Sequence, residues 1–126
     1  MRSPKLLVAE DDAAMREALQ MQLTRAGFDV TAVDNGADAV IAATEQEFDL
    51  ALLDLVMPGL NGIQAARMLR RIKPGLALVA LTAYAAEYSA QAAALGLTCL
   101  SKPMPMEALV RELRAALPPG AWPIQV

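Results

Sequence analysis

The stretch from Leu50 to Gly59, which reads LALLDLVMPG, constrains the fold more than any other part of this sequence. It is a short apolar run that ends in Asp54 and is followed at once by a turn containing Pro58. A short apolar run bounded by turn residues is typical of a strand buried on both faces of a parallel sheet. Open α/β folds bind ligands at the carboxyl ends of such strands, so Asp54 is a candidate site residue. Taken alone, an Asp at a strand end more often only caps a loop.

Apolar runs alternate with segments of helical spacing along the rest of the chain. We predict strands at residues 5–9, 28–33, 49–53, 76–81 and 97–101. We predict helices at residues 13–26, 36–47, 62–72, 85–95 and 105–117. Asp12 suits the N-cap of the first helix, and Gly27 suits its C-terminal end. Strict alternation implies an α/β fold with a single five-stranded parallel sheet, right-handed crossovers and helices on both faces.

Apolar spacing within the helices predicts which face of each packs against the sheet. In the third helix the residues at i, i+3, i+4 and i+7 are Ala65, Met68, Leu69 and Ile72. The basic residues of that segment are then predicted to form a solvated face: Arg67, Arg70, Arg71 and Lys73. Residues 85–95 are Ala-rich and weakly amphipathic, so we expect a helix that packs lightly and shifts easily.

Composition excludes several classes of protein. The net charge of −3 gives no support for direct nucleic-acid binding through a basic face. A single cysteine, Cys99, excludes an internal disulfide and suits a reducing cytosol, so we expect a cytoplasmic protein. No apolar run reaches membrane-spanning length, and none suits a signal peptide. The chain has no histidine, which excludes His-based catalysis and a phosphohistidine relay from within it.

Candidate site residues follow four of the five predicted strands. They are Glu10, Asp11 and Asp12 after the first strand, Asp54 after the third, Thr82 after the fourth and Lys102 after the fifth. Each has an ordinary explanation when taken alone: Asp12 as an N-cap, Thr82 as a turn residue and Lys102 as a surface lysine. Because parallel strands all finish at one edge of the sheet, we instead expect these side chains to converge on one site.

The chemistry of such a cluster points to a bound cation. Two carboxylates about 4 Å apart repel by about 4 kcal/mol at an effective dielectric constant near 20. Oxygen ligands without His or Cys select Mg²⁺, Mn²⁺ or Ca²⁺, and few protein ligands with room for water and a phosphate suit Mg²⁺ best. Lys102 and Thr82 supply a point charge and a hydroxyl donor for phosphoryl oxygens. Asp54 could then act as a nucleophile that forms an aspartyl phosphate.

These residues, taken in order, resemble the receiver domain of bacterial two-component response regulators, the CheY-like family. The motifs that carry the resemblance are Glu10-Asp11, Asp54 with Met57-Pro58-Gly59, Thr82-Ala83 and Lys102-Pro103. The resemblance extends over about residues 5–117 and implies a flavodoxin-like (βα)5 sandwich with strand order 2-1-3-4-5. Residues 1–117 would form the domain, and residues 118–126 would be a tail or the start of a linker.

The resemblance also implies a role for each site residue. Asp54 would be the phosphoacceptor, and Mg²⁺ would be bound directly by Asp11, Asp54 and the carbonyl of Val56, with Glu10 acting mostly through a metal-bound water. Thr82 and Lys102 would contact the phosphoryl group, and the backbone N–H groups of Val56 and Ala83 would add donors. The Lys102–Pro103 peptide bond would be cis.

The partners implied are a sensor histidine kinase or a histidine phosphotransfer protein, and a downstream protein or fused output domain. The surface formed by the fourth helix, fifth strand and fifth helix would meet these partners. Such a domain takes part in its own phosphorylation and dephosphorylation, and it is not a turnover enzyme on an external substrate.

The sequence departs from the family pattern at three positions. Cys99 stands where the fifth strand usually carries an aromatic switch residue. Whether the movement of Thr82 is coupled to this strand, as it is in the family, is therefore open. Val56 and Tyr84 replace polar side chains that orient a hydrolytic water in fast members. We therefore expect a long-lived aspartyl phosphate.

The sequence also bears on three alternative functions. A phosphatase of the haloacid dehalogenase type needs a second Asp two residues after the nucleophile, where this chain has Val56. A flavin-binding flavodoxin needs a hydroxyl- and Gly-rich phosphate loop after the first strand, where residues 10–12 are acidic. A receiver-like domain that binds partners without phosphorylation is disfavoured because every site residue is present, although Cys99 keeps this alternative open.

Overall fold

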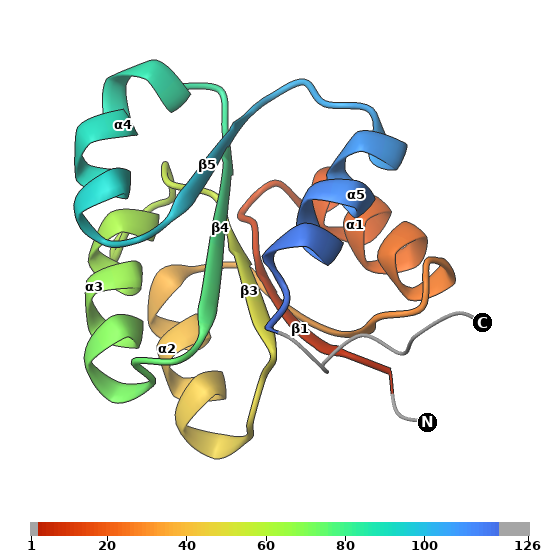
Figure 1. The fold of residues 1–126 in the computed structure, drawn as a ribbon, viewed down its shortest axis with the longest axis horizontal. Helices are drawn as coiled ribbons and strands as arrows, with labels where there is room; N and C mark the ends of the chain where they lie inside the picture. The colour runs from red at the N-terminus through yellow and green to blue at the C-terminus, as the bar shows by residue number, and fades with distance from the viewer. Residues whose placement is uncertain (1–2, 119–126) are drawn as a thin grey trace.

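The structure is a computed structural model that describes residues 3–118 (Figure 1). Its elements, in chain order, are β1 (Lys5–Ala9), α1 (Ala13–Arg25), β2 (Asp29–Val33), α2 (Gly36–Glu45), β3 (Leu50–Leu53), α3 (Gly62–Ile72), β4 (Ala77–Thr82), α4 (Ala85–Ala94), β5 (Thr98–Ser101) and α5 (Met106–Ala116). The strands form one parallel sheet in the order β2-β1-β3-β4-β5. This confirms the predicted α/β fold and its strand order. From residue 119 onward, the predicted tail lies outside the described residues.

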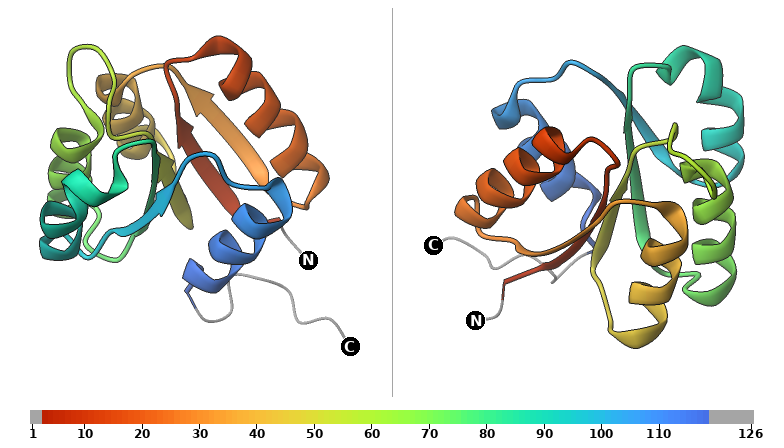
Figure 2. Two further views of the ribbon diagram at one scale, coloured as in Figure 1. Left: turned by 90° about the horizontal axis from the view of Figure 1, so that it is seen from above. Right: turned by 180° about the vertical axis from the view of Figure 1, so that it is seen from behind.

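Helices cover both faces of the sheet, with α1 and α5 on one side and α2, α3 and α4 on the other (Figures 1 and 2). The central strand β3 is buried from both sides, and its side chains alternate between the two apolar clusters. Leu50 and Leu52 pack in the cluster beneath α1 and α5, whereas Ala51 and Leu53 pack in the cluster beneath α2, α3 and α4. The continuous apolar run therefore reflects burial on both faces, as predicted.

Local signals place the ends of the helices. Asp12 caps α1, because its side chain accepts a hydrogen bond of 3.1 Å from the backbone N–H of Ala14. Gly27 follows α1 with a φ of 107°, a conformation that glycine adopts without strain. Asn61 and Gln64 form a capping box at the start of α3. The helix predicted to reach residue 47 ends at Glu45, and the other boundaries lie within about two residues of the predictions.

The predicted buried face of α3 is confirmed at Ala65 and Leu69 and is wrong at Met68 and Ile72. Met68 and Ile72 are 44% and 42% exposed. The buried residues of α3 are Ile63 and the set Gly62, Ala65, Ala66 and Leu69. Both sets follow the same i, i+3, i+4, i+7 spacing, so the apolar pattern alone does not choose between them. The structure uses the set with smaller side chains, which lets the backbone of α3 approach the loop after β3.

The predicted solvated role of Arg70 is also wrong. Its guanidinium donates to the carbonyl oxygens of Leu95 at 3.1 Å, Pro74 at 3.1 Å, Leu76 at 2.6 Å and Gly96 at 3.4 Å. Carbonyls at the end of a helix lack intrahelical partners, and Arg70 supplies donors for those that follow α4. The side chain therefore joins the end of α3 to the C-terminal end of α4.

The two ends of α4 are held differently. Its N-cap residue, Tyr84, makes no side-chain capping bond, and Ala92 is the one buried residue of this helix. The helix is thus fixed mainly at its C-terminal end, in agreement with the light packing expected from its alanines. Among residues 3–118, no helix combines the length and apolar character needed to cross a membrane.

Candidate functional site

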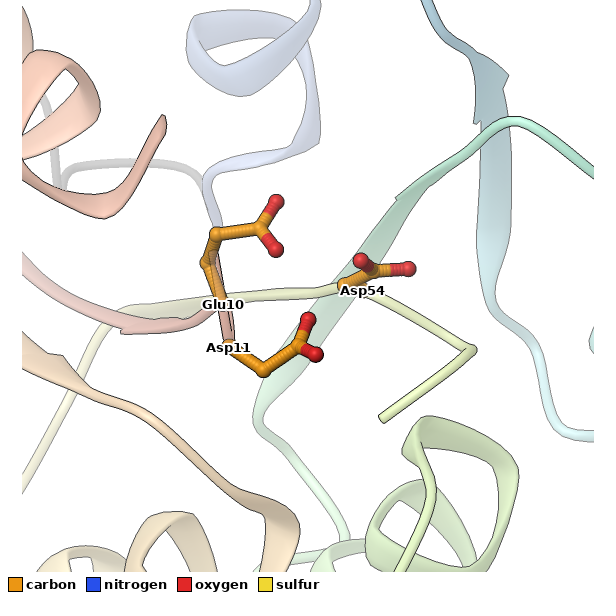
Figure 3. Close-up of side chains that lie close together, drawn as sticks. All are labelled: Glu10, Asp11 and Asp54. Atoms are coloured by element: carbon orange, nitrogen blue, oxygen red, sulfur yellow. The ribbon is translucent and has the colours of Figure 1, made fainter. Parts of the chain in front are cut away.

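The acidic residues converge at the carboxyl ends of the central strands. Glu10 follows β1 and Asp54 follows β3, and their backbones stay tied to neighbouring strands: Glu10 N–H donates to Val33 at 3.1 Å and Asp54 N–H donates to Ala9 at 2.9 Å. Figure 3 shows the side chains of Glu10, Asp11 and Asp54 gathered in one region. One carboxylate oxygen from each of these three residues lies within 4.8 Å of the other two.

Two of the three acids are buried and have hydrogen-bond donors. Glu10 is 2% exposed, and its Oε2 accepts from the backbone N–H of Asp12 at 3.2 Å. Asp54 is 9% exposed, and its Oδ1 accepts from the backbone N–H of Val56 at 3.1 Å. Asp11 is exposed, and within residues 3–118 no donor is within hydrogen-bonding distance of its carboxylate.

Lys102, in the loop after β5, brings a positive charge into this cluster. Its Nζ donates to Oε1 of Glu10 at 2.6 Å and to Oδ2 of Asp54 at 3.1 Å. The backbone N–H of Lys102 bonds to the carbonyl of Thr82 at 2.9 Å, which fixes the loop to the end of β4. The Lys102–Pro103 peptide bond is cis.

Burial and neighbouring charges shift the pKa values of Glu10 and Lys102. Burial raises the pKa of Glu10 above its ordinary value of 4.5, and the charge of Asp54 adds to this, while the bonds from Lys102 and from Asp12 N–H oppose it. Burial lowers the pKa of Lys102, but its hydrogen bonds to Glu10 and Asp54 outweigh that effect and hold the pKa above 10.5. Lys102 is therefore cationic at neutral pH.

The other predicted site residues differ in how deeply they are buried. Thr82 is fully buried, and its hydroxyl accepts a hydrogen bond of 3.2 Å from the backbone N–H of Tyr84. The side chains of Val56 and Tyr84 are exposed, as is Ala83. Cys99 is half-buried on β5, with its Sγ 3.9 Å from the carbonyl oxygen of Ala85, and burial raises the pKa of its thiol.

Sequence reasoning missed two residues that shape the site. Arg16 of α1 donates from Nη1 to the carbonyls of Glu10 and Asp11. Gly62 opens α3 directly against Asp54, because a Cβ at this position would lie 2.2 Å from the carbonyl oxygen of Asp54. A glycine lowers the stability of a helix. Gly62, directly after the Asn61 cap, therefore indicates that the backbone of this helix lies very close to another segment. The contacts of Arg16 had no signal in the sequence.

The donor set fits a hard divalent cation. Three carboxylates offer oxygen ligands within one small region, and neither histidine nor the thiol of Cys99 belongs to it. Carboxylate oxygens with space for water are the ligands that suit Mg²⁺. The exposure of Asp11 leaves one side of the cluster open to solvent.

Comparison with known proteins gives consistent matches. The family model described as response regulator receiver domain matches residues 6–114. The response regulator receiver protein CpdR of Brucella abortus is 39% identical over 115 residues, which are 90% of this chain and 96% of that protein. The DNA-binding response regulator MtrA of Mycobacterium tuberculosis is 43% identical over 79 residues, which are 63% of this chain. The matched part is only 34% of MtrA, so the chain spans about a third of that relative.

A solved structure has the same fold over nearly the whole chain. The response regulator protein TrrA of Thermotoga maritima, crystallised in complex with Mg²⁺-BeF, superposes with a TM-score of 0.83. The two proteins are 27% identical, and the match includes 93% of this chain and 100% of the other.

Proposed function

Because this chain belongs to the response regulator receiver domain family of two-component signal transduction, we propose that Asp54 is its phosphoacceptor. The observation that carries the proposal is the cluster of Glu10, Asp11 and Asp54, whose carboxylate oxygens lie within 4.8 Å of one another beside Lys102. Receiver domains are signalling domains and not turnover enzymes on external substrates. The domain would extend over residues 1–117.

The transfer would use the carboxylate of Asp54 as a nucleophile. One of its oxygens attacks the phosphorus of a phosphohistidine on a partner protein, a P–O bond forms, and the P–N bond breaks. The leaving imidazole nitrogen keeps the bonding electrons and takes a proton from solvent. Lys102, already 3.1 Å from Asp54, would move its contact to a phosphoryl oxygen, and the N–H groups of Val56 and Ala83 would add donors.

We infer that Mg²⁺ is the cofactor. Asp11, Asp54 and the carbonyl oxygen of Val56 would bind it directly, and Glu10 would act through a water. When bound, the ion would neutralise the acids and the oxygens of the incoming phosphoryl group. The carboxylates supply the negative charge that holds the ion. Lys102 compensates the charge of the two buried carboxylates, Glu10 and Asp54.

The switch would act through α4, β5 and α5. The hydroxyl of Thr82 now bonds to the N–H of Tyr84, and contact with a phosphoryl group would draw it away from the start of α4. That end of α4 has no side-chain cap, so the exchange would shift the packing of the α4–β5–α5 surface. Cys99 lies on this surface at the position of the usual aromatic residue.

The partners proposed are a sensor histidine kinase or histidine phosphotransfer protein, and a downstream protein or fused output domain in the cytoplasm. We do not expect this domain to bind nucleic acid directly or to associate with a membrane. A phosphohistidine donor would have to lie outside residues 1–126, because these contain no histidine.

Intact mass spectrometry after incubation with acetyl phosphate tests the proposal. The wild-type protein should gain one phosphoryl group only when Mg²⁺ is present, and Asp54→Asn should gain none. Asp12→Asn is the matched control, because asparagine also caps a helix and the Asp12 side chain faces Ala14. A folded wild-type protein that binds Mg²⁺ but gains no mass would favour a domain that acts without phosphorylation.

A further inference from the structure

The side chain of Arg16 of α1 binds two consecutive carbonyl groups of the loop between β1 and α1. Its Nη1 donates to the carbonyl of Glu10 at 3.0 Å and to that of Asp11 at 3.3 Å. Its backbone N–H donates to the carbonyl of Asp12 at 2.8 Å. The bond to Asp12 is the first backbone hydrogen bond of the helix, so the arginine side chain itself holds the peptide carbonyls of residues 10 and 11.

The consequence is greatest for Asp11. The carboxylates of Glu10 and Asp54 are held by direct donors, but within the described residues no donor is within reach of the Asp11 carboxylate. Its carboxylate nevertheless lies with the other two in Figure 3. The position of the Asp11 side chain therefore depends on its backbone, and Arg16 holds that backbone from the helix side.

We propose that Arg16 is a positioning residue for the magnesium site, which keeps the Asp11 carboxylate directed at Asp54. This inference rests on the proposed function, because it assumes that the acidic cluster binds Mg²⁺. Arg16 donates to main-chain oxygens and makes no hydrogen bond to the three carboxylates, so it does not compete for the metal-binding oxygens.

Charge and positioning predict opposite effects of removing Arg16. A positive charge close to a cation site repels the cation, so electrostatics alone predicts that its removal strengthens Mg²⁺ binding. A positioning role predicts weaker binding, because the Asp11 carboxylate loses its fixed orientation. Groups that orient a metal ligand typically contribute about 10- to 100-fold in metal affinity. The sign of the change therefore separates the two roles.

The test is isothermal titration of the unphosphorylated protein with MgCl₂. Arg16→Met should weaken Mg²⁺ binding about tenfold. Arg16→Lys, which keeps the charge but not the planar guanidinium, should lie between Arg16→Met and the wild type. Arg25→Met is the matched control, since Arg25 is an exposed arginine in the last turn of the same helix. Its affinity for Mg²⁺ should equal that of the wild type.

A second readout separates positioning from loss of structure. The Mg²⁺ concentration that gives half the maximal rate of phosphorylation by acetyl phosphate should rise in Arg16→Met, while the rate at saturating Mg²⁺ stays near that of the wild type. A general loss of structure would lower the saturated rate as well. Should Arg16→Met fail to fold, Arg16→Lys still tests the inference: it keeps the charge, so electrostatics alone predicts unchanged Mg²⁺ binding, whereas a positioning role predicts weaker binding.

Unchanged or tighter Mg²⁺ binding by Arg16→Met would overturn the inference. A wild-type protein that binds no Mg²⁺ would overturn the metal site and this inference together. If the wild type binds Mg²⁺ but Asp54 is not phosphorylated, the proposed function fails, and the affinity of Arg16→Met still decides the role of Arg16.

Discussion

The Nζ atom of Lys102 lies 2.6 Å from Oε1 of Glu10, and the same ammonium is 3.1 Å from Oδ2 of Asp54. One lysine from the end of β5 thus compensates the two buried acids at the ends of β1 and β3. The arrangement joins three strand ends by electrostatic attraction at the edge of the sheet where phosphorylation is proposed to occur.

Replacing Lys102 should therefore destabilise the fold. Lys102→Met leaves two buried carboxylates without a cation, and we expect the free energy of unfolding to fall by about 1–3 kcal/mol, below the range for a fully buried pair. The matched control is Lys73→Met, since Lys73 pairs with Glu47 at the same 2.6 Å but the Glu47 side chain is 85% exposed. Its loss should be below about 0.5 kcal/mol. Urea unfolding at neutral pH without divalent ions measures the free energy of unfolding of each variant. Equal losses in Lys102→Met and Lys73→Met would contradict the role given to burial.

Removing an exposed acid from the cluster should stabilise the protein. Asp11 repels Glu10 and Asp54, and no donor within residues 3–118 compensates its charge, so Asp11→Asn should raise the free energy of unfolding by roughly 1 kcal/mol in the absence of Mg²⁺. Addition of Mg²⁺ should raise the melting temperature of the wild type more than that of the variant. Thermal unfolding with and without Mg²⁺ provides the measurement, and a variant less stable than the wild type in the absence of the metal would refute the repulsion.

The close contact between α3 and Asp54 predicts a large effect of a single methyl group. In Gly62→Ala the new Cβ would lie 2.2 Å from the carbonyl oxygen of Asp54 and 2.6 Å from Cα of Leu55, so the backbone has to shift. We expect a loss of about 1–3 kcal/mol of stability together with slower phosphorylation of Asp54. Gly75→Ala is the control, because a Cβ there meets nothing within 4 Å. Calorimetry measures the melting temperature of each variant, and an equal decrease in the two variants would exclude this account.

The sequence predicted the elements and the convergence of the acids for simple reasons. Apolar runs such as residues 50–53 report burial directly, and parallel strands place their carboxyl ends at one edge, which brought Glu10, Asp54 and Lys102 together. The order of the strands came from the family resemblance, since periodicity alone does not fix which strands are neighbours.

What the sequence could not predict depends on contacts between distant segments. The choice of face for α3 was ambiguous, because Ala66 and Met68 belong to two sets of residues with the same spacing. Arg16 and Arg70 reach backbone carbonyls, and any residue has a carbonyl, so their partners leave no mark in the sequence. Long polar side chains that bind main-chain oxygens are therefore revealed only by the structure.

Cys99 provides a chemical test of the environment of β5. Burial raises the pKa of its thiol above the ordinary value of 9.0, so at a given pH less thiolate is present than in an ordinary thiol. Alkylation by iodoacetamide should be slower than for a free cysteine at pH 8, and its rate should reach half its maximum above pH 9. Mass spectrometry follows the reaction at one site because the chain has one cysteine, and unfolding in urea should restore the ordinary rate. A midpoint below that of the unfolded protein would contradict a buried thiol.

The side chains that flank Asp54 predict a slowly hydrolysed aspartyl phosphate. Val56 and Tyr84 are both exposed, and neither carries an amide or carboxylate that could orient an attacking water toward the phosphorus. Val56→Asn and Tyr84→Glu should each shorten the lifetime of the phosphorylated protein by roughly tenfold, because each adds such a group. The lifetime is measured as loss of the added mass in Mg²⁺ after removal of acetyl phosphate. Met21→Asn, an exposed apolar residue on α1, is the control and should leave the lifetime unchanged. Rapid hydrolysis in the wild type that neither substitution accelerates would show that these two positions do not set the rate.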